Sequence, residues 1–347
     1  MISISSSAAQ PPRDADPFPR LDRNGDGKLT RDELPPPMQR LLERMDANKD
    51  GTVSREEEAV FRKNRPGGAG GGDRGLAETT RTFKNLRYVE KGHERHVLDL
   101  YVPAEPKSAR PLVIWIHGGG WQNGSKENCP ALSLTSQGFA VASINYRLSS
   151  HAPFPAQIQD CQAAVRWLRA QAGEYGLNPE KFGAWGSSAG GHLVALLGTT
   201  GDVDNFEVLG GHRDVSHQVQ AVCDWFGPTD FLQMDRQAGR TGRFGHNDAN
   251  SPESKLVGGP ITEHPDRVAR ANPVTYVSQA DPPFLICHGD ADNLVPLGQS
   301  ELLQAALQKA QVPVTLYVVQ GGGHGGWSDP RPRELVEQFF KKQLQDQ

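Results

Sequence analysis

A serine in the middle of the chain has the glycine neighbours that a catalytic nucleophile needs. Residues 182–191 read FGAWGSSAGG, so Gly186 and Gly190 lie two positions either side of Ser188. A serine that attacks an acyl carbon must stand clear of its own backbone, on a turn too tight for neighbouring side chains. The G-x-S-x-G pattern is typical of such a strand-to-helix turn, although small residues also cluster at ordinary strand–helix junctions. Ser188 is therefore the candidate nucleophile, and the adjacent Ser187 is its rival.

Two later segments supply an acid and a base. Residues 288–296 read HGDADNLVP and residues 321–327 read GGGHGGW, and each follows an apolar run. The order Ser188, Asp292, His324 is the chain order of the catalytic triad in α/β-hydrolases. This order predicts acyl transfer, in which a histidine removes the serine proton and an aspartate orients the histidine.

Both later members of this set have rivals. Asp290 competes with Asp292 as the acid, and an aspartate after a strand is otherwise usually a turn residue or a cap. Three other histidines compete with His324 as the base: His117, His192 and His288. We favour His324 because it comes late in the chain and lies in a glycine-rich loop. We expect His117 to brace the adjacent glycine loop and His192 to be structural.

A run of glycines precedes the candidate nucleophile. Residues 117–120 read HGGG and follow the apolar segment PLVIWI. Glycines at this place let backbone N–H groups turn inward with no side chain in the way. We expect the N–H of Gly118 or Gly119, together with that of Ala189, to face the oxygen of a tetrahedral intermediate. Trp121 follows closely enough to line a substrate pocket, and its alternative role is to pack beneath the loop.

Two acidic segments near the N-terminus have the spacing of a twelve-residue calcium loop. Residues 22–33 read DRNGDGKLTRDE and residues 46–57 read DANKDGTVSREE. Calcium takes oxygen ligands from positions 1, 3, 5 and 12 and from the backbone carbonyl at position 7, with a glycine at position 6 for the turn. The expected ligands are Asp22, Asn24, Asp26, Lys28 and Glu33 in the first loop and Asp46, Asn48, Asp50, Thr52 and Glu57 in the second. Two plain Asp-Gly turns are the alternative, and two full matches in tandem argue against it.

The order of the remaining elements predicts the fold that positions these groups. Apolar runs such as PLVIWI and FAVASI are continuous, as in strands that are buried on both faces of a sheet. Amphipathic segments such as FPAQIQDCQAAVRWLRAQA alternate with them. This alternation predicts a doubly wound, mostly parallel α/β sheet, whose functional groups gather beyond the carboxyl ends of the strands. Residues 229–270 interrupt the pattern, and we expect them to form a small cap.

Composition divides the chain into three parts. Residues 15–63 hold the two calcium loops and resemble an EF-hand pair, although Pro17 and Pro19 shorten the helix that enters the first loop. Residues 64–78 are rich in glycine and predict a flexible linker. Residues 79–347 hold the alternating strands and helices, so we expect them to form the catalytic domain.

Charge and cysteine usage exclude several classes of protein. The chain has 347 residues and a formal net charge of −4, which gives no indication of a nucleic-acid partner. It contains no apolar run of about 18 residues, so we expect no membrane span. Its cysteines are too widely spaced for a metal site or a disulfide framework, and we expect free, buried thiols at Cys129, Cys161, Cys223 and Cys287.

Five motifs together resemble one family. HGGGW, NYRL, HAPFPAQIQD, GSSAGGHL and HGDADNLVP occur in this order. In this respect the chain resembles α/β-hydrolase esterases of the hormone-sensitive-lipase-like and feruloyl/acetylxylan-esterase-like branches. The last motif resembles the family's H-G-x-x-D-x-x-V-P, in which the second acid is catalytic, and this implies Asp292. The resemblance implies a serine carboxylesterase that acts on short-chain acyl or carbohydrate-linked esters without an organic or catalytic-metal cofactor.

Several alternatives stay open at this point. HGGGWQ also resembles kynurenine formamidases, and HGDADNLVP resembles prolyl-oligopeptidase-type peptidases, for whose propeller this chain has no room. A calcium-dependent binding protein with a non-catalytic hydrolase scaffold is the alternative from a different class. A homo-oligomer is compatible with the sequence. Calcium loops suit the extracytoplasmic space, where the ion is abundant, so we expect a periplasmic or secreted protein, with the cytoplasm as the alternative.

Overall fold

The chain forms two compact units, residues 1–72 and 73–347. The computed structural model describes residues 18–22, 24–34, 42–46, 48–57, 80–104, 109–203, 206–238 and 245–346. The predicted linker at 64–78 lies outside these residues, and so does Pro17. Each unit has a hydrophobic core of its own.

The first unit is organised around a pair of short strands. Its described elements are α1 (Phe18–Leu21), β1 (Lys28–Leu29), α3 (Leu42–Met45) and β2 (Val53–Ser54). The two strands pair antiparallel, with Leu29 opposite Val53. Both side chains are fully buried and pack with Phe18, Leu34 and Met45. This contact joins the two loops that the sequence identifies as calcium loops.

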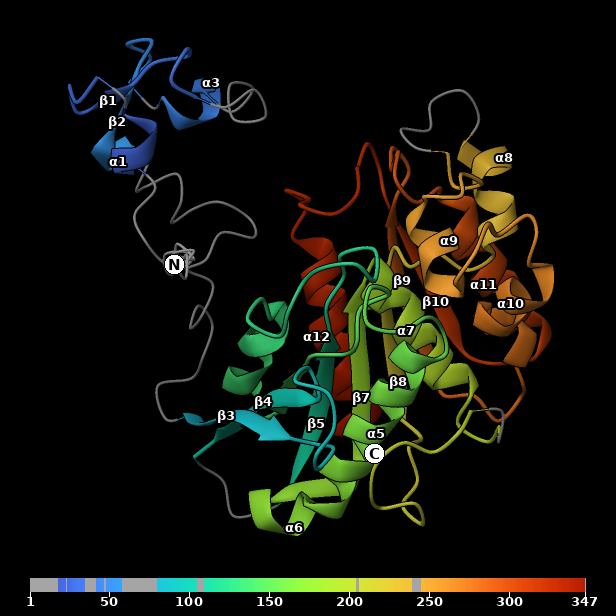
Figure 1. Cartoon of the computed structure of the whole chain (residues 1–347). Coiled ribbons are helices and arrows are strands. Elements are labelled where there is room, and N and C mark those ends of the chain that lie inside the picture. The colour runs from blue at the N-terminus through green and yellow to red at the C-terminus, as the bar shows by residue number, and fades with distance from the viewer. Residues whose placement is uncertain are drawn as a thin grey trace, which may run out of the picture. The chain divides into compact units, whose positions relative to one another are not determined.

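Among the described residues, the second unit is built on an eight-stranded sheet of order β10-β9-β8-β7-β5-β6-β4-β3 (Figure 1). The strands are β3 (Thr80–Arg87), β4 (Val97–Pro103), β5 (Arg110–Ile116), β6 (Ala140–Ile144), β7 (Leu177–Ser187), β8 (Ala221–Trp225), β9 (Phe284–Gly289) and β10 (Val314–Val319). β4 pairs antiparallel with β3 and with β6, and the other neighbours are parallel. The predicted doubly wound, mostly parallel sheet is confirmed.

Helices cover both faces of this sheet, as Figure 1 shows for α5 and α7 in front of it and α12 behind it. The helices are η1 (Pro130–Gln137), α5 (Ala156–Ala170), α6 (Ala172–Tyr175), α7 (Ala189–Thr199), α11 (Gly298–Lys309) and α12 (Arg331–Leu344). Side chains of β5 alternate between two apolar clusters, with Leu112, Ile114 and Ile116 in one and Val113 and Trp115 in the other. This alternation explains the continuous apolar run, because both faces of the strand are buried.

The helix that follows Ser188 is buried along its whole length. All residues of α7 are shielded from solvent, so it is apolar on every side. At Gly198 a Cβ atom would lie 2.7 Å from side-chain atoms of both Val222 and Phe284, so glycine lets α7 approach the sheet closely. The C-terminal end of α7 is thereby packed closely against β8 and β9.

Short helices form the cap that was expected between β8 and β9. They are η2 (Phe231–Gln233), α8 (Met234–Ala238), α9 (Pro252–Val257), α10 (Pro265–Ala271) and η4 (Pro273–Tyr276). Ser251 caps α9, because its hydroxyl accepts a hydrogen bond from the Ser254 N–H at 3.0 Å. Gly258 ends that helix with a φ of +77°, a conformation that glycine adopts without strain.

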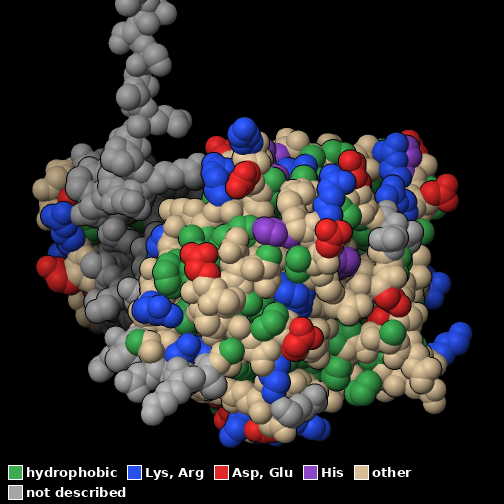
Figure 2. Space-filling model, turned by 90° about the horizontal axis from the view of Figure 1, so that it is seen from below, with side chains coloured by type: hydrophobic (Ala, Val, Ile, Leu, Met, Phe, Trp, Pro, Cys, Tyr) green, Lys and Arg blue, Asp and Glu red, His purple; other side chains and the backbone are tan. Residues whose placement is uncertain are grey.

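The surface and the thiols agree with the sequence analysis. Lys and Arg side chains are interspersed with Asp and Glu on the face that Figure 2 shows. None of the helices within the described ranges is long and apolar enough to cross a bilayer. All four cysteines are buried and free, as expected.

Candidate active site

Ser188 occupies a strained turn between β7 and α7. Its backbone has φ 53° and ψ −123°, a combination that residues with a side chain rarely adopt. Two hydrogen bonds hold the turn: the Ser188 N–H donates to the Trp225 carbonyl at 2.8 Å, and the Ser188 carbonyl accepts from the His192 N–H at 3.0 Å. The strain is thus imposed by the adjacent strand and the first turn of the helix.

The glycines around Ser188 are required by close packing. A Cβ atom at Gly186 would collide with the carbonyl of Gly190, and one at Gly190 would collide with the carbonyl of Ile116. At Gly118 a Cβ atom would lie 3.2 Å from the Ser188 Cβ. Only hydrogen atoms fit at these three places, which explains the G-x-S-x-G pattern in physical terms.

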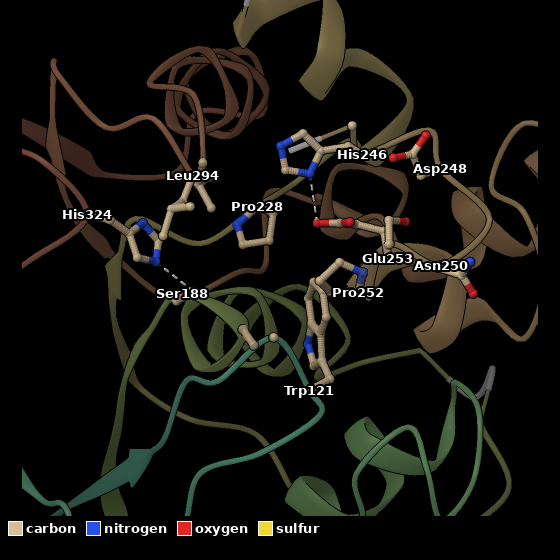
Figure 3. Close-up of a pocket in the computed structure, with 15 residues that line it drawn as sticks. Trp121, Ser188, Pro228, His246, Asp248, Asn250, Pro252, Glu253, Leu294 and His324 are labelled. Atoms are coloured by element: carbon tan, nitrogen blue, oxygen red, sulfur yellow. Dashed lines mark hydrogen bonds and ion pairs between the residues drawn. The ribbon is translucent and has the colours of Figure 1, made fainter. Parts of the chain in front are cut away.

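The structure brings Ser188, His324 and Asp292 together in one chain of hydrogen bonds. His324 Nε2 lies 2.9 Å from Ser188 Oγ, and His324 Nδ1 lies 2.7 Å from Asp292 Oδ2. The Asp292 side chain is fully buried, whereas that of His324 is 19% exposed. Figure 3 shows the His324 ring pointing at Ser188 on one side of a pocket. This arrangement can transfer a proton from the hydroxyl to the imidazole.

The two competing aspartates have different partners. Asp292 Oδ1 accepts hydrogen bonds from the N–H groups of Leu294 and Val295 at 2.8 and 3.0 Å. Asp290 is exposed, and its Oδ1 accepts from the Gly321 N–H at 2.6 Å. Asp290 therefore ties the acid loop to the loop that carries the histidine, while only Asp292 contacts the imidazole.

His288, which competes with His324 as the base on sequence grounds, is a second partner of the acid Asp292. Its Nε2 lies 3.4 Å from Asp292 Oδ2, and its Nδ1 lies 2.7 Å from Ser300 Oγ. Burial alone would raise the pKa of Asp292, but hydrogen bonds from His288 and His324 hold it well below its usual range. The carboxylate therefore stays ionised beside the imidazole throughout the neutral pH range.

His117 and His192 are structural, as expected. Burial lowers the pKa of each to about 4, so both are neutral at pH 7. His117 stacks on Tyr146 with ring centroids 4.4 Å apart, and its Nδ1 lies 2.8 Å from the Gly118 carbonyl. His192 Nε2 lies 2.6 Å from the Ala271 carbonyl. His117 therefore braces the glycine loop, and His192 ties α7 to the cap.

Three backbone N–H groups beside Ser188 are free to bind an oxyanion. Those of Gly118, Gly119 and Ala189 have no hydrogen-bond acceptor within the described parts of the chain. Gly119 has a φ of +108°, which only glycine tolerates well. Such donors, held in place before the reaction, stabilise the charge that develops on a carbonyl oxygen.

A pocket of about 380 Å³ opens beside the serine. Its lining residues are Gly120, Trp121, Ser188, Ala189, Pro228, Gly245, His246, Asp248, Asn250, Ser251, Pro252, Glu253, Leu294, Val295 and His324. Trp121 lines this pocket and is also buried against His192 of α7 and Phe231 of the cap. In Figure 3 Ser188 and His324 lie on one side of the pocket, and His246 and Glu253 lie on the other.

The cap contributes the pocket residues that sequence reasoning missed. His246 and Glu253 form a buried pair, with His246 Nδ1 3.1 Å from Glu253 Oε1. They belong to a polar segment without a recognised motif, and the only signal was a histidine and an acid within a region expected to be a cap.

Two of the five motifs prove to be scaffold. Arg147 of NYRL binds Asp160 of HAPFPAQIQD, with Arg147 Nη2 2.6 Å from Asp160 Oδ1. His96 Nε2 lies 3.1 Å from the same oxygen, and Asp160 is fully buried. The ion pair fixes the segment that joins β6 to α5, because an unpaired buried carboxylate would be costly.

The two loops of the first unit have nearly the same geometry. In the first, Asp22 Oδ2 accepts from the Gly27 N–H at 2.9 Å, and Glu33 Oε2 accepts from the Thr30 N–H at 2.9 Å. The second loop repeats these contacts at Asp46–Gly51, 2.8 Å, and Glu57–Ser54, 2.9 Å. The other predicted ligands lie on the same loops: Asn24, Asp26, Lys28, Asn48, Asp50 and Thr52.

The donor set of these loops fits calcium. Each loop offers three carboxylates and an asparagine, and oxygen is the ligand atom that calcium prefers. Gly27 and Gly51 have φ values of +80° and +86°, as the sharp turn at position 6 requires. Within the described ranges, no three His, Cys, Asp or Glu side chains are gathered as around a metal ion. The carboxylates instead accept hydrogen bonds from their own loops.

The fold and the arrangement around Ser188 are those of an α/β-hydrolase. The model of the BD-FAE family matches residues 98–307, and the chain belongs to this family. The EF-hand family model matches residues 17–34 and 38–57, so the first unit is an EF-hand pair.

Curated relatives are named as esterases. Esterase LipC of Mycobacterium tuberculosis is 32% identical over 258 residues, which cover 70% of this chain and 61% of the relative. Probable carboxylic ester hydrolase LipM of the same organism is 31% identical, over 62% of this chain and 49% of the relative. The chain thus spans about half to three fifths of the length of these relatives.

Solved structures similar to this chain include carbohydrate esterases. A truncated carbohydrate esterase from gut microbiota has a TM-score of 0.71 and 38% identity, covering 78% of this chain and 99% of that chain. A bifunctional GH43-CE protein of Bacteroides eggerthii has a TM-score of 0.68 and 34% identity, covering 76% and 38%. The esterase Est2 of Thermogutta terrifontis has a TM-score of 0.60 and 26% identity, covering 76% and 92%.

Proposed function

We propose that this protein is a serine carboxylesterase that hydrolyses short-chain acyl or carbohydrate-linked esters. The observation that carries this proposal is the chain of hydrogen bonds from Ser188 through His324 to Asp292 at the mouth of a pocket. The names of the relatives, which include esterases and a carbohydrate esterase, support the reaction class.

In the first step Ser188 is acylated. His324 Nε2 takes the hydroxyl proton while Ser188 Oγ attacks the ester carbonyl carbon. The N–H groups of Gly118 or Gly119 and of Ala189 bind the negative oxygen of the tetrahedral intermediate. Asp292 holds the imidazole in the correct tautomer and stabilises the imidazolium. His324 then gives its proton to the departing alkoxide, which leaves as the alcohol.

In the second step water releases the acid. His324 removes a proton from a water molecule, whose oxygen attacks the acyl carbon of the ester on Ser188. The same N–H groups bind the negative oxygen of the second tetrahedral intermediate. This intermediate collapses when His324 returns the proton to Ser188 Oγ. The products are a carboxylic acid, an alcohol and the free enzyme, and these steps use side chains and backbone N–H groups of this chain together with water.

Hydrolysis of p-nitrophenyl acetate tests the proposal. We expect turnover by the full chain and its loss in Ser188→Ala. The same assay separates an enzyme from a calcium-dependent binding protein with a non-catalytic scaffold, which would show no turnover above that of Ser188→Ala. N-formylated anilines and proline-containing peptides, assayed in parallel, distinguish the esterase from an arylformamidase or a peptidase with the same triad.

We further propose that calcium binds the first unit as a structural ion. The donors are the side chains at positions 1, 3, 5 and 12 of each loop and the carbonyls of Lys28 and Thr52. The fit of the donor set and the EF-hand family match support this assignment. It accords with the periplasmic or secreted location that we also propose.

A further inference from the structure

A buried ion pair forms part of the pocket wall away from the nucleophile. His246 is 5% exposed and Glu253 is 4% exposed, although both line the pocket. Figure 3 shows the Glu253 side chain reaching from α9 into the space between His246 and Trp121. No step of the proposed esterase mechanism uses either residue, so their place in the pocket needs another explanation.

His246 is hydrogen-bonded to Glu253 within the pocket wall. Its Nδ1 lies 3.1 Å from Glu253 Oε1. Burial lowers the pKa of His246, but the hydrogen bond to Glu253 and its charge raise it overall above the usual value. A glutamate carboxylate carries lone pairs only, so each of its two oxygens can accept a hydrogen bond.

The second oxygen of this carboxylate lacks a partner. Glu253 Oε2 is shielded from solvent and has no hydrogen-bond donor within the described parts of the chain. The indole Nε1 of Trp121, on the wall of the same pocket, is likewise buried and without an acceptor there. A buried polar group without a partner is destabilising and requires an explanation. A hydroxyl group of a bound molecule can satisfy Glu253 Oε2, because a hydroxyl donates one hydrogen bond.

We propose that Glu253 determines specificity by accepting a hydrogen bond from a hydroxyl on the part of the substrate that fills the pocket. This inference rests on the proposed esterase function. Ala189, Leu294 and Val295 make the wall near Ser188 apolar, whereas His246 and Glu253 make the opposite wall polar. The pocket thus suits a group that is apolar next to the ester and carries a hydroxyl further away.

Two kinds of ester carry such a hydroxyl. One has a phenolic hydroxyl on an aromatic acyl group, and the other has free hydroxyls on a sugar that is the alcohol. Two pairs of substrates distinguish them: methyl 4-hydroxycinnamate against methyl 4-methoxycinnamate, and a monoacetylated methyl xyloside against its di-O-methyl counterpart. In each pair the ester is the same, and methyl groups replace only the hydrogens of the free hydroxyls.

In the unmodified full chain, we expect kcat/KM to be at least about tenfold higher for the hydroxylated member of one pair, as for a hydrogen bond to a charged group. The pair that shows the preference identifies the source of the hydroxyl. In Glu253→Gln the preference should fall below about threefold, because the amide presents a weaker, neutral acceptor. Glu263→Gln is the matched control: Glu263 is an exposed cap residue outside the pocket, and its variant should retain the preference.

Loss of the preference must be separated from loss of the fold. If Glu253→Gln does not fold, as judged by its melting temperature, Glu253→Asp replaces it, since it keeps the charge beside His246 but shortens the side chain. The absence of a preference in both pairs, or its persistence in the folded variant, would overturn the inference. Hydrolysis of p-nitrophenyl acetate that depends on Ser188 would then still support the esterase, and only its absence would overturn the proposed function.

Discussion

Ser187 and Ser188 are neighbours in sequence but have different surroundings. Ser187 is the last residue of β7 and pairs with Trp225 of β8, whereas Ser188 is in the strained turn with its Oγ 2.9 Å from His324 Nε2. The choice between the two serines therefore follows from the backbone conformation of a single residue.

Ser188→Ala should abolish nearly all esterase activity and leave the fold intact, because Oγ is the attacking atom. Removal of one triad member often costs as much as removal of several. Ser187→Ala should retain substantial activity. The measurement is kcat/KM for p-nitrophenyl acetate, with circular dichroism as the check on folding. The reverse ranking of the two variants would contradict the assignment of the nucleophile.

Asp292→Asn should lower kcat by about four orders of magnitude, as in other Ser-His-Asp triads. The reason is loss of the His324 tautomer that presents an unprotonated Nε2 to the serine. Asp290→Asn should cost much less, because Asp290 contacts the Gly321 N–H and not the imidazole. Steady-state kinetics of both variants provide the test, and equal losses would leave the acid unassigned.

At the scale of elements, a buried acid, Asp224, lies near the end of β8, beside helix α7. Asp224 is 1% exposed, and its Oδ1 accepts from the Gly227 N–H at 2.9 Å. Its Oδ2 has no partner among the described residues, and burial raises its pKa to about 6. The same oxygen Oδ1 would collide with a Cβ at Gly191, so Asp224 helps to set the approach of α7 to β8.

This pKa predicts a pH dependence of stability. The folded state binds the Asp224 proton more tightly than the unfolded state, whose pKa is near 3.8. Stability therefore declines as the pH rises from about 4 to about 6, by at most about 3 kcal/mol at 1.36 kcal/mol per pKa unit. Asp224→Asn lacks this decline and keeps the acceptor for Gly227. Urea unfolding at pH 4, 5, 6 and 7 tests it, and parallel curves for the two chains would refute it.

The cap elements limit the length of the acyl chain. No long apolar lid helix lies in the described part of the cap, and the pocket ends at the charged pair His246 and Glu253. An aliphatic tail reaching that wall would leave Glu253 Oε2 without a hydrogen-bond partner. We therefore expect acetyl and butyryl p-nitrophenyl esters to have higher kcat/KM than the octanoyl ester. A preference for octanoyl would contradict this view of the pocket.

At the scale of the whole molecule, the EF-hand pair and the hydrolase have separate cores. In the first unit, Leu29 and Val53 join the two loops through their backbone pairing, so ordering of one loop affects the other. In the second unit, the triad is built from β7, β9 and β10 and the loops that follow them. We therefore expect calcium to order the first unit and not to take part in the chemistry of the second.

Calcium should raise the melting temperature of the first unit, because the three carboxylates of each loop repel one another without the ion. We expect its affinity to lie between sensor-like values and the roughly 10⁻⁴–10⁻³ M of extracellular modules. We expect kcat/KM to change less than about threefold between calcium and EGTA, since the glycine-rich composition of residues 64–78 predicts a linker that transmits little strain. Calorimetry and esterase assays on the full chain test this, with Glu33→Gln/Glu57→Gln as the control. A calcium-dependent activity that this double variant loses would show instead that the module regulates catalysis.

Local chemistry explains what could be read from the sequence alone. The turn at Ser188, the glycine loop at 117–120 and the two EF-hand loops each depend on residues within about a dozen positions, so their patterns specify them. The alternation of apolar runs with amphipathic segments likewise predicts a mostly parallel sheet, because a strand buried on both faces must be apolar throughout. These features, including the four buried thiols, are present in the structure as expected.

Tertiary packing decided what depends on residues far apart in the chain. Ser188 and His324 are 136 positions apart, and only the parallel alignment of strand ends in the sheet brings them within hydrogen-bond distance. The same packing joins Asp290 to the loop that carries His324. It also places the pair His246 and Glu253 in the pocket. No short-range pattern encodes such contacts, because each depends on how the cap packs on the sheet. The three candidate triad residues could therefore be predicted from the sequence, whereas the residues that line the pocket beside them could be identified only from the fold.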